Sequence, residues 1–519
     1  MQGVISTPHR EATEAGKDIF SRGGNAVDAA LAAAAVLTVV YPHQCALGGD
    51  LFALVDNGAG CVTAVNGSGA AAENLDVDAM RERYGQVPDS GPDAITVPGL
   101  VAGWQSLSEQ AGQLSWEYLL QPAIKLAEKG VSVSRSLAAG IHYRAPAMDK
   151  GMRNLFLSGG QPLVEGDVLV QIALAKTLRI LATQGGESFY RGELSKRLAG
   201  GLERLECVVS LSDLQQHKTE LTQPLSFEYR GFELLTSPPN SQGFTLLQSL
   251  AALEAIGVGL DAHGPEATYL LHACLMAAAD RDSLLGDPRR VELPLGRLLD
   301  KRSLAQRMLT RSKSLPEALS ENVPAHGDTV AVCAMDSEGR AVSLIQSLFQ
   351  TFGAAVLEEE TGVIFHNRAR GFSLDKNAPN YMVQGSRPAH SLMPLLLRQQ
   401  GTTLASLGTM GGKAQPQILA QLLAGAMDLN SDLNEVLANP RWVFGARDID
   451  FPRPTVAIES DAPAELDDYL AVSGLDVARI DSCTESVGHA QIVRRQADMT
   501  LAGASDPRSD GSSETYAGC

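Results

Sequence analysis

The sequence predicts a mixed α/β fold, built as one large layered domain or as two domains. Its 519 residues are too many for one ordinary hydrophobic core. Residues 326–353 show the pattern of a β-hairpin: apolar residues at alternate positions 330, 332 and 334 lead into a turn at 336–339, and a return strand rich in β-branched and aliphatic residues follows at 341–348. Residues 29–41 form an apolar run that is too short to span a bilayer, which indicates a buried helix. Residues 169–184 repeat apolar side chains at helical spacing.

The predicted helix at 29–41 has recognisable boundaries. Before it, Arg22-Gly23-Gly24-Asn25 ends one helix and starts the next, and Asp28 lies in the first turn. A proline ends the apolar run, and Gly48-Gly49-Asp50 then leads into a predicted strand at 51–55. The N-terminal region therefore predicts a helix followed by a strand.

The hairpin draws attention to Thr329, at the start of its first strand. A two-residue loop would place Thr329 opposite Gln346, and one more loop residue would place it opposite Ser347. Taken alone, a threonine here is most simply a strand residue of good β propensity.

A second strand–turn–helix unit follows near residue 400. A strand at 403–407 precedes Gly408-Thr409-Met410-Gly411-Gly412-Lys413, and a helix is predicted at 415–425. Backbone N–H groups converge at such a turn and can stabilise an oxyanion. A phosphate loop is not favoured, because Leu407 replaces the first glycine of that motif and Ala414 replaces its hydroxyl residue. A plain tight turn remains the structural alternative.

Composition narrows the class of partner and the compartment. The net charge of −18 argues against nucleic acid or an anionic membrane as partner. Seven scattered cysteines without a C-x-x-C pair predict reduced, mostly buried thiols. Neither His nor Cys residues fall at ligand spacings, so we expect no metal and no organic cofactor. The first residues carry charge and proline where a signal peptide needs an apolar core, so we expect a cytoplasmic protein.

Several of these segments, in this order, resemble the γ-glutamyltranspeptidase family of N-terminal nucleophile (Ntn) hydrolases. The likeness rests on Gly24-Asn25-Ala26-Val27-Asp28, on Gly48-Gly49-Asp50 and on Gly327-Asp328-Thr329 with the hairpin behind it. Asn-Arg-x-x-x-Phe-Ser-Leu-Asp at 367–375 and Arg-Pro-x-His-Ser at 387–391 look like the cytoplasmic branch that includes oxamate amidohydrolase and cephalosporin-acylase-like proteins.

The resemblance implies a fold and a maturation step. The fold would be an αββα four-layer sandwich, with two stacked antiparallel sheets between helical layers. The chain would cut itself before Thr329, leaving residues 1–328 as a large subunit and 329–519 as a small one, together one intertwined domain. Residues 315–328, with two prolines and a glycine, are the predicted exposed linker ahead of the cut.

The chemistry of an N-terminal threonine needs little other machinery. Its own α-amine, with a reference pKa of about 7.7–8.0, can take the hydroxyl proton. By resemblance, Thr329 is the nucleophile, Ser347 replaces the family threonine that hydrogen-bonds it, and Gly411 and Gly412 form the oxyanion hole. Residues 373–376 fit S-x-x-K, but the accompanying K-T-G is absent, so a serine–lysine acylase is not favoured.

The segments that bind substrate in the family differ in this chain. Phe349 stands where an asparagine is expected, Ser68 falls near the arginine that pairs with the α-carboxylate, and Arg368 and Gly371 replace the Gln and Asp that hold the α-amine. A pocket that loses its carboxylate and gains an arginine should favour an anion over an amino-acid head group.

We therefore predict that Arg368, His390 and Ser391 anchor a carboxylate on a small acyl group; the last two replace the family's serine pair. The simpler alternative for Arg368 and Arg370 is a solvated loop.

These observations predict an autoprocessed amide hydrolase or acyltransferase that acts on a small carboxylate-bearing amide such as oxamate, through an acyl-enzyme on Thr329. Two alternatives stay open: a γ-glutamyltransferase or glutathione hydrolase, and a binding protein that is never processed. The expected partners are the small-molecule amide and the two cleaved subunits for each other. The sequence leaves the oligomeric state open, including a homodimer of the processed heterodimer.

Overall fold

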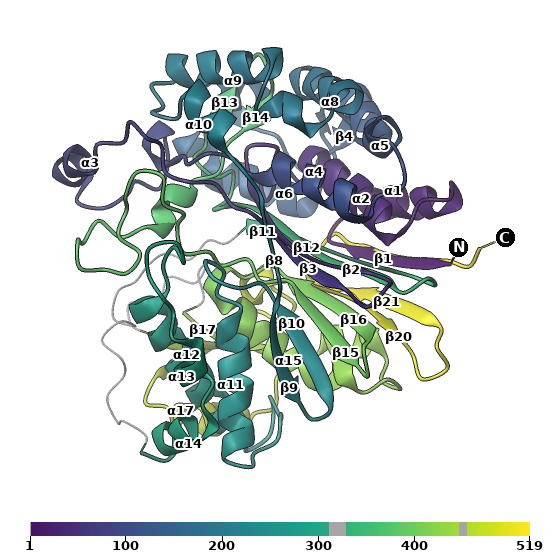
Figure 1. The fold of residues 1–519 in the computed structure, drawn as a ribbon, viewed down its shortest axis with the longest axis vertical. Helices are drawn as coiled ribbons and strands as arrows, with labels where there is room; N and C mark the ends of the chain where they lie inside the picture. Colours follow the sequence, from purple (N-terminus) through teal and green to yellow (C-terminus); the bar gives the residue numbers. More distant parts are fainter. Residues whose placement is uncertain (1, 311–327, 446–453, 519) are drawn as a thin grey trace.

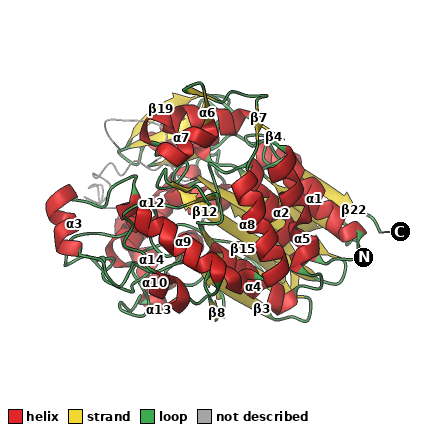
Figure 2. Ribbon diagram, turned by 90° about the horizontal axis from the view of Figure 1, so that it is seen from above, coloured by secondary structure: helices red, strands yellow, loops and turns green. Residues whose placement is uncertain are grey.

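The structure is a computed structural model that describes residues 2–310, 328–445 and 454–518. Two antiparallel sheets lie face to face in the centre of the molecule, and helices cover the outer face of each (Figure 1). A view from above shows one helical layer spread over its sheet (Figure 2). The predicted four-layer αββα sandwich is confirmed. The predicted linker at 315–328 lies outside the described residues except for Asp328.

The two central sheets contain most of the strands. The first has the order β22-β1-β11-β12-β2-β3-β8, which in that order are Ser512–Tyr516, Gly3–Thr7, Asp328–Asp336, Arg340–Phe349, Asp50–Asn57, Val62–Gly67 and Glu220–Thr222. The second has the order β21-β20-β16-β15-β10-β9, which are Leu501–Ser505, Ala490–Arg495, Thr402–Thr409, Leu395–Gln399, Phe232–Thr236 and Leu225–Tyr229. Shorter strands lie outside these sheets: β4 (Val131–Ser132), β5 (Leu157–Ser158), β6 (Gln161–Pro162), β7 (Val168–Leu169), β13 (Leu357–Glu358), β14 (Val363–Ile364), β17 (Trp442–Phe444), β18 (Thr455–Glu459) and β19 (Asp476–Ile480).

Each central sheet combines strands from before and after Thr329. In the first sheet, the β11–β12 hairpin lies between β1 and β2 and pairs with both. In the second sheet, β10 pairs with β15. The two portions of the chain therefore share backbone hydrogen bonds in both sheets.

The helices before residue 205 other than α3, together with the short α10, cover the first sheet through one large hydrophobic core. They are α1 (Arg10–Ser21), α2 (Ala26–Val40), α4 (Leu100–Ala111), α5 (Trp116–Lys129), α6 (Arg135–Arg144), α7 (Lys150–Phe156), α8 (Ile172–Gln184), α9 (Glu193–Arg204) and α10 (Leu211–Gln216). Every residue of α2 is buried, because α2 packs against α1, α5 and the sheet. Asn25 and Asp28 form a capping box at its start. The predicted buried helix at 29–41 is confirmed.

A second core joins the other sheet to its own helices. These are α11 (Phe244–Ala255), α12 (Ala267–Leu284), α14 (Lys301–Thr310), α15 (Gln415–Met427), α16 (Leu433–Ala438) and α17 (Leu466–Ala471), while α3 (Val77–Tyr84) and α13 (Leu295–Leu298) belong to smaller clusters. The helix predicted at 169–184 begins later, at Ile172, because Val168 and Leu169 pair with β4 instead.

Successive side chains of the hairpin lie on opposite faces of the first sheet. Val330 belongs to the core under the helices, whereas Ala331 and Cys333 belong to clusters between the sheets. Thr329 continues this second series, so its side chain faces the space between the sheets. The register pairs Thr329 with Ser347, the pairing expected for the longer of the two predicted loops.

Two further findings concern the described residues taken together. Among the described residues, no helix is both long enough and apolar enough to cross a membrane. The described cysteines are free thiols and most are buried, as predicted.

Candidate active site

The candidate nucleophile, Thr329, is buried at the start of β11. Its Oγ1 donates a hydrogen bond to Ser347 Oγ over 3.1 Å, and Ser347 Oγ donates to the carbonyl oxygen of Asp328 over 2.6 Å. A β-bulge separates Asp328 from Thr329 in the pairing with β12. The two hydroxyls therefore form a chain that starts at Thr329 and ends on the carbonyl of the peptide bond before it.

Arg368 lies beside this hydroxyl chain, at the first position of a 3-10 turn. Its Nη2 is 3.4 Å from Ser347 Oγ, and its Nη1 is 3.4 Å from Ser391 Oγ. The guanidinium carbon lies 4.2 Å from the centre of the Phe349 ring, in cation–π geometry. Arg368 is buried, so the solvated-loop alternative is wrong for this residue. The structure thus brings the predicted residues Arg368, Ser391 and Ser347 together.

The buried guanidinium of Arg368 is charged but poorly satisfied. Burial lowers the pKa of Arg368 to about 10, against the opposing charge of Asp50, so the group stays charged at neutral pH. Its hydroxyl contacts are at the long end of the hydrogen-bond range, and its Nε has no hydrogen-bond acceptor among the described residues. A carboxylate could complete this fork in bidentate geometry. Arg370 differs, because it pairs with the half-exposed Asp89 over 2.7 Å.

His390 has a protein group next to each of its ring nitrogens. Its Nε2 lies 3.2 Å from Asp50 Oδ2, and its Nδ1 accepts a hydrogen bond from the backbone of Leu392 over 3.3 Å. Burial and the neighbouring charge of Arg368 lower the pKa of His390 to about 3, so the ring is neutral. Both ring nitrogens are therefore engaged, which gives His390 a position behind Arg368 and leaves no ring N–H for the predicted substrate contact.

The glycine-rich turn after β16 holds Gly411 and Gly412 with φ of 138° and 53°. Both values lie in the region that favours glycine. Gln242 Nε2 donates to the carbonyl oxygens of Gly412, over 2.9 Å, and of Ser391, over 2.8 Å, so one amide ties this turn to the Arg368 side of the site. The predicted strand–turn–helix arrangement is present, with β16 before the turn and α15 after it.

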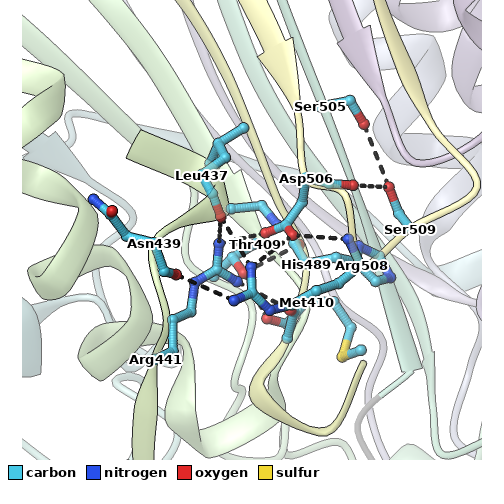
Figure 3. A network of polar contacts seen from close by, with 12 residues as sticks. Thr409, Met410, Leu437, Asn439, Arg441, His489, Ser505, Asp506, Arg508 and Ser509 are labelled. Atoms are coloured by element: carbon cyan, nitrogen blue, oxygen red, sulfur yellow. Dashed lines mark hydrogen bonds and ion pairs between the residues drawn. The ribbon is translucent and has the colours of Figure 1, made fainter. Parts of the chain in front are cut away.

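A buried ionic network supports the same turn (Figure 3). Asp506 lies between Arg441 and Arg508, and it also accepts a hydrogen bond from the backbone of Ala490 over 2.9 Å. The neighbouring carbonyl of His489 accepts one from the N–H of Met410, just before the glycine pair, over 2.9 Å. The network therefore fixes the start of β20, to which the glycine-rich turn is hydrogen-bonded.

Replacing Arg508 with methionine should cost about 3–5 kcal/mol of unfolding free energy, because its carboxylate partners Glu459 and Asp506 stay buried with fewer donors. Arg10→Met is the matched control: its ion pair with Glu14 is exposed and worth about 0–1 kcal/mol. Denaturant unfolding measures both. Equal, small losses would show that the network does not stabilise the fold.

Sequence reasoning missed Asp50 as part of the site. It appeared only as the end of a Gly-Gly-Asp turn, yet β2 pairs it directly with Ser347. The available signal in the sequence was an acid placed directly before an apolar strand. Among residues 2–310, 328–445 and 454–518, no three His, Cys, Asp or Glu side chains gather as a metal site would require.

The four-layer αββα arrangement is the fold of the Ntn-hydrolase class. A family model for gamma-glutamyltranspeptidase matches residues 12–516, so the chain belongs to that family. It is therefore an amide hydrolase or acyltransferase.

Similar proteins cover nearly the whole chain. The "Glutathione hydrolase-like YwrD proenzyme" of Bacillus subtilis is 34% identical, with 98% of this chain and 97% of the relative covered. The "Oxamate amidohydrolase proenzyme" of Klebsiella pneumoniae is 32% identical, with 99% and 98% covered. Among solved structures, cephalosporin acylase from Bacillus halodurans has a TM-score of 0.90 and 29% identity, with 100% of this chain and 96% of that chain covered. Both curated relatives are named as proenzymes.

Proposed function

We propose that the chain cuts itself between Asp328 and Thr329, and that the processed enzyme hydrolyses a small amide that carries a carboxylate, such as oxamate. The observation that carries the substrate class is the buried guanidinium of Arg368, which has too few hydrogen-bond acceptors. It contacts the same Ser347 hydroxyl as Thr329 does. Both relatives are named as proenzymes, which supports the cleavage step, and one is named an oxamate amidohydrolase, which supports the substrate class.

The hydroxyl chain suggests how cleavage begins. As Thr329 Oγ1 bonds to the carbonyl carbon of Asp328, its proton passes to Ser347 Oγ, and the Ser347 proton passes to the carbonyl oxygen. The carbon–nitrogen bond then breaks, the α-amine of Thr329 takes up the proton, and an ester links Asp328 to the Thr329 side chain. Water hydrolyses this ester, leaving residues 1–328 and 329–519.

Replacing Ser347 with alanine should slow cleavage about 10- to 100-fold, because the proton path and the donor to the Asp328 carbonyl are lost together. Ser343→Ala is the control: Ser343 lies on the same strand and face, but its hydroxyl donates to the carbonyl of Leu407 over 2.6 Å. The rate is measured by intact mass against time after synthesis. Equal rates for the two variants would remove Ser347 from the cleavage step.

After cleavage, the freed α-amine of Thr329 becomes the general base. A modest downward shift of its pKa from the reference value of about 7.7–8.0 makes it neutral at cellular pH, so it can accept the proton of its own hydroxyl. In this proposal, Gly411 and Gly412 donate backbone N–H groups to the oxyanion of the substrate. The acyl group then passes to water, or to an amine.

The cleaved portions should remain associated. The β11–β12 hairpin pairs with β1 on one side and with β2 on the other, and β22 also pairs with β1, so separating the portions would break all three of these ladders. Each such sheet edge would expose unpaired backbone groups and the large core beneath it.

The substrate class is tested by comparing kcat/KM of the processed enzyme for oxamate and for a γ-glutamyl anilide. We expect oxamate to be the better substrate. The reverse order would favour the second candidate, glutathione or γ-glutamyl hydrolysis, which the name of the Bacillus subtilis relative supports.

A further inference from the structure

Asp50 is a buried carboxylate in line with the candidate nucleophile. Thr329 pairs with Ser347 on the neighbouring strand, and Ser347 pairs with Asp50 on the next, so three strands bring these side chains into one row. Asp50 is fully buried. An ionised carboxylate in such a place is costly unless other groups compensate it, so its partners indicate its role.

Donors surround Asp50. Its Oδ1 accepts hydrogen bonds from the backbone of Gly69, over 3.2 Å, and of Gly99, over 3.3 Å. Its two oxygens lie 3.5 Å from His366 Nε2 and 3.2 Å from His390 Nε2. Burial alone would raise the pKa of Asp50, but these histidines hold it well below its usual value, so Asp50 is ionised.

His390 donates to Asp50 without balancing its charge, and His366 Nε2 lies slightly further away, at 3.5 Å. His366 Nδ1 accepts a hydrogen bond from the backbone of Arg368 over 3.2 Å, and His390 Nδ1 accepts one from Leu392. A nitrogen that accepts a hydrogen bond carries no proton, so the ring proton of each histidine lies on Nε2, on the side of Asp50. The cation that balances Asp50 is Arg368, whose Nε lies 3.9 Å from Oδ2. Within the described part of the chain, Asp50 is the only acid this close to Arg368.

We propose that Asp50 is a positioning residue: the counter-charge that keeps Arg368 buried in the empty site and limits the site to one substrate carboxylate. Asp50 holds the Nε side of the guanidinium, which leaves Nη1 and Nη2 directed at Ser391 and Ser347, where the carboxylate would bind. Once one carboxylate is bound, the region carries a net negative charge and repels a second anion. This inference rests on the proposed function.

The test compares the affinity of the processed enzyme for propionate and for propionamide, which have the same size and differ by one charge. Isothermal titration gives both Kd values for wild type, Asp50→Asn and Arg368→Met. Wild type should prefer propionate. Asp50→Asn keeps an oxygen for Gly69 and Gly99 but removes the repelling charge, so its preference for propionate should rise about tenfold. Arg368→Met should lose the preference.

Each outcome has one meaning. A purely structural role for Asp50 would weaken both probes alike, so an unchanged or smaller preference in Asp50→Asn overturns the inference. If wild type itself does not prefer propionate, the carboxylate anchor of the proposed function is wrong, and the inference falls with it.

A second variant covers a loss of folding. Asp50→Asn leaves the Arg368 charge buried alone and should lower Tm, whereas the double variant Asp50→Asn/Arg368→Met removes both charges and should recover part of that loss. A double variant as unstable as Asp50→Asn would mean that Asp50 serves only the backbone of Gly69 and Gly99, which contradicts the proposal.

Discussion

Replacing Thr329 with alanine is expected to leave an uncut chain without amidase activity. The hydroxyl of Thr329 is both the group that attacks the Asp328 carbonyl and, after cleavage, the proposed nucleophile toward substrate. Its removal eliminates the acyl-enzyme in both steps, so activity should fall at least about 10⁴-fold. Denaturing electrophoresis and a rate assay with oxamate measure the two effects.

Two controls separate chemistry from folding in this variant. Thr329→Ser keeps the hydroxyl and should retain measurable cleavage and activity. Thr329→Ala should still unfold cooperatively on heating, because only a hydroxyl and a methyl group are lost. Cleavage at the same bond in a folded Thr329→Ala variant would show that the nucleophile is another residue.

Replacing Arg368 with methionine should lower kcat/KM for oxamate about 100-fold or more, which corresponds to roughly 3 kcal/mol. Removing one partner of a buried, hydrogen-bonded charge pair typically costs 2–5 kcal/mol. The same variant should change the rate with a neutral amide much less, because only the charged substrate uses the fork. Steady-state kinetics with both substrates gives the ratio that matters.

Arg370→Met is the matched control for this prediction. Arg370 lies two residues away in the same turn, but it pairs with the half-exposed Asp89 instead of facing Ser347. Its loss should change both rates less than about threefold. Arg368→Lys keeps the charge without the planar fork and should fall between wild type and Arg368→Met. Equal losses with the charged and the neutral amide in Arg368→Met would remove its anchoring role.

Local patterns predicted much of the fold. The apolar run at 29–41 could be predicted as a buried helix, because a helix that is buried on all sides needs no polar face. Asn25 and Asp28 marked the start of this helix. The alternation after Thr329 predicted the hairpin but left two registers open, since only the turn geometry decides between Gln346 and Ser347.

The arrangement of the site depended on contacts that the sequence does not display. The local sequence around Arg368 reads as a solvated loop, and its burial arises because the turn packs under distant segments; Asn367 Nδ2, for example, donates to the carbonyl of Asp89 over 2.8 Å. Asp50 was missed because its histidine partners, His366 and His390, lie more than 300 residues further along the chain. The family resemblance located the nucleophile region, whereas the partners of Arg368 required coordinates.

The most direct test of the account is the intact mass of the purified wild-type protein under denaturing conditions, with N-terminal sequencing of the smaller species. Two polypeptides are expected, residues 1–328 and 329–519, the second beginning at Thr329. A single uncut chain after prolonged incubation, or a second polypeptide that begins at another residue, would contradict it.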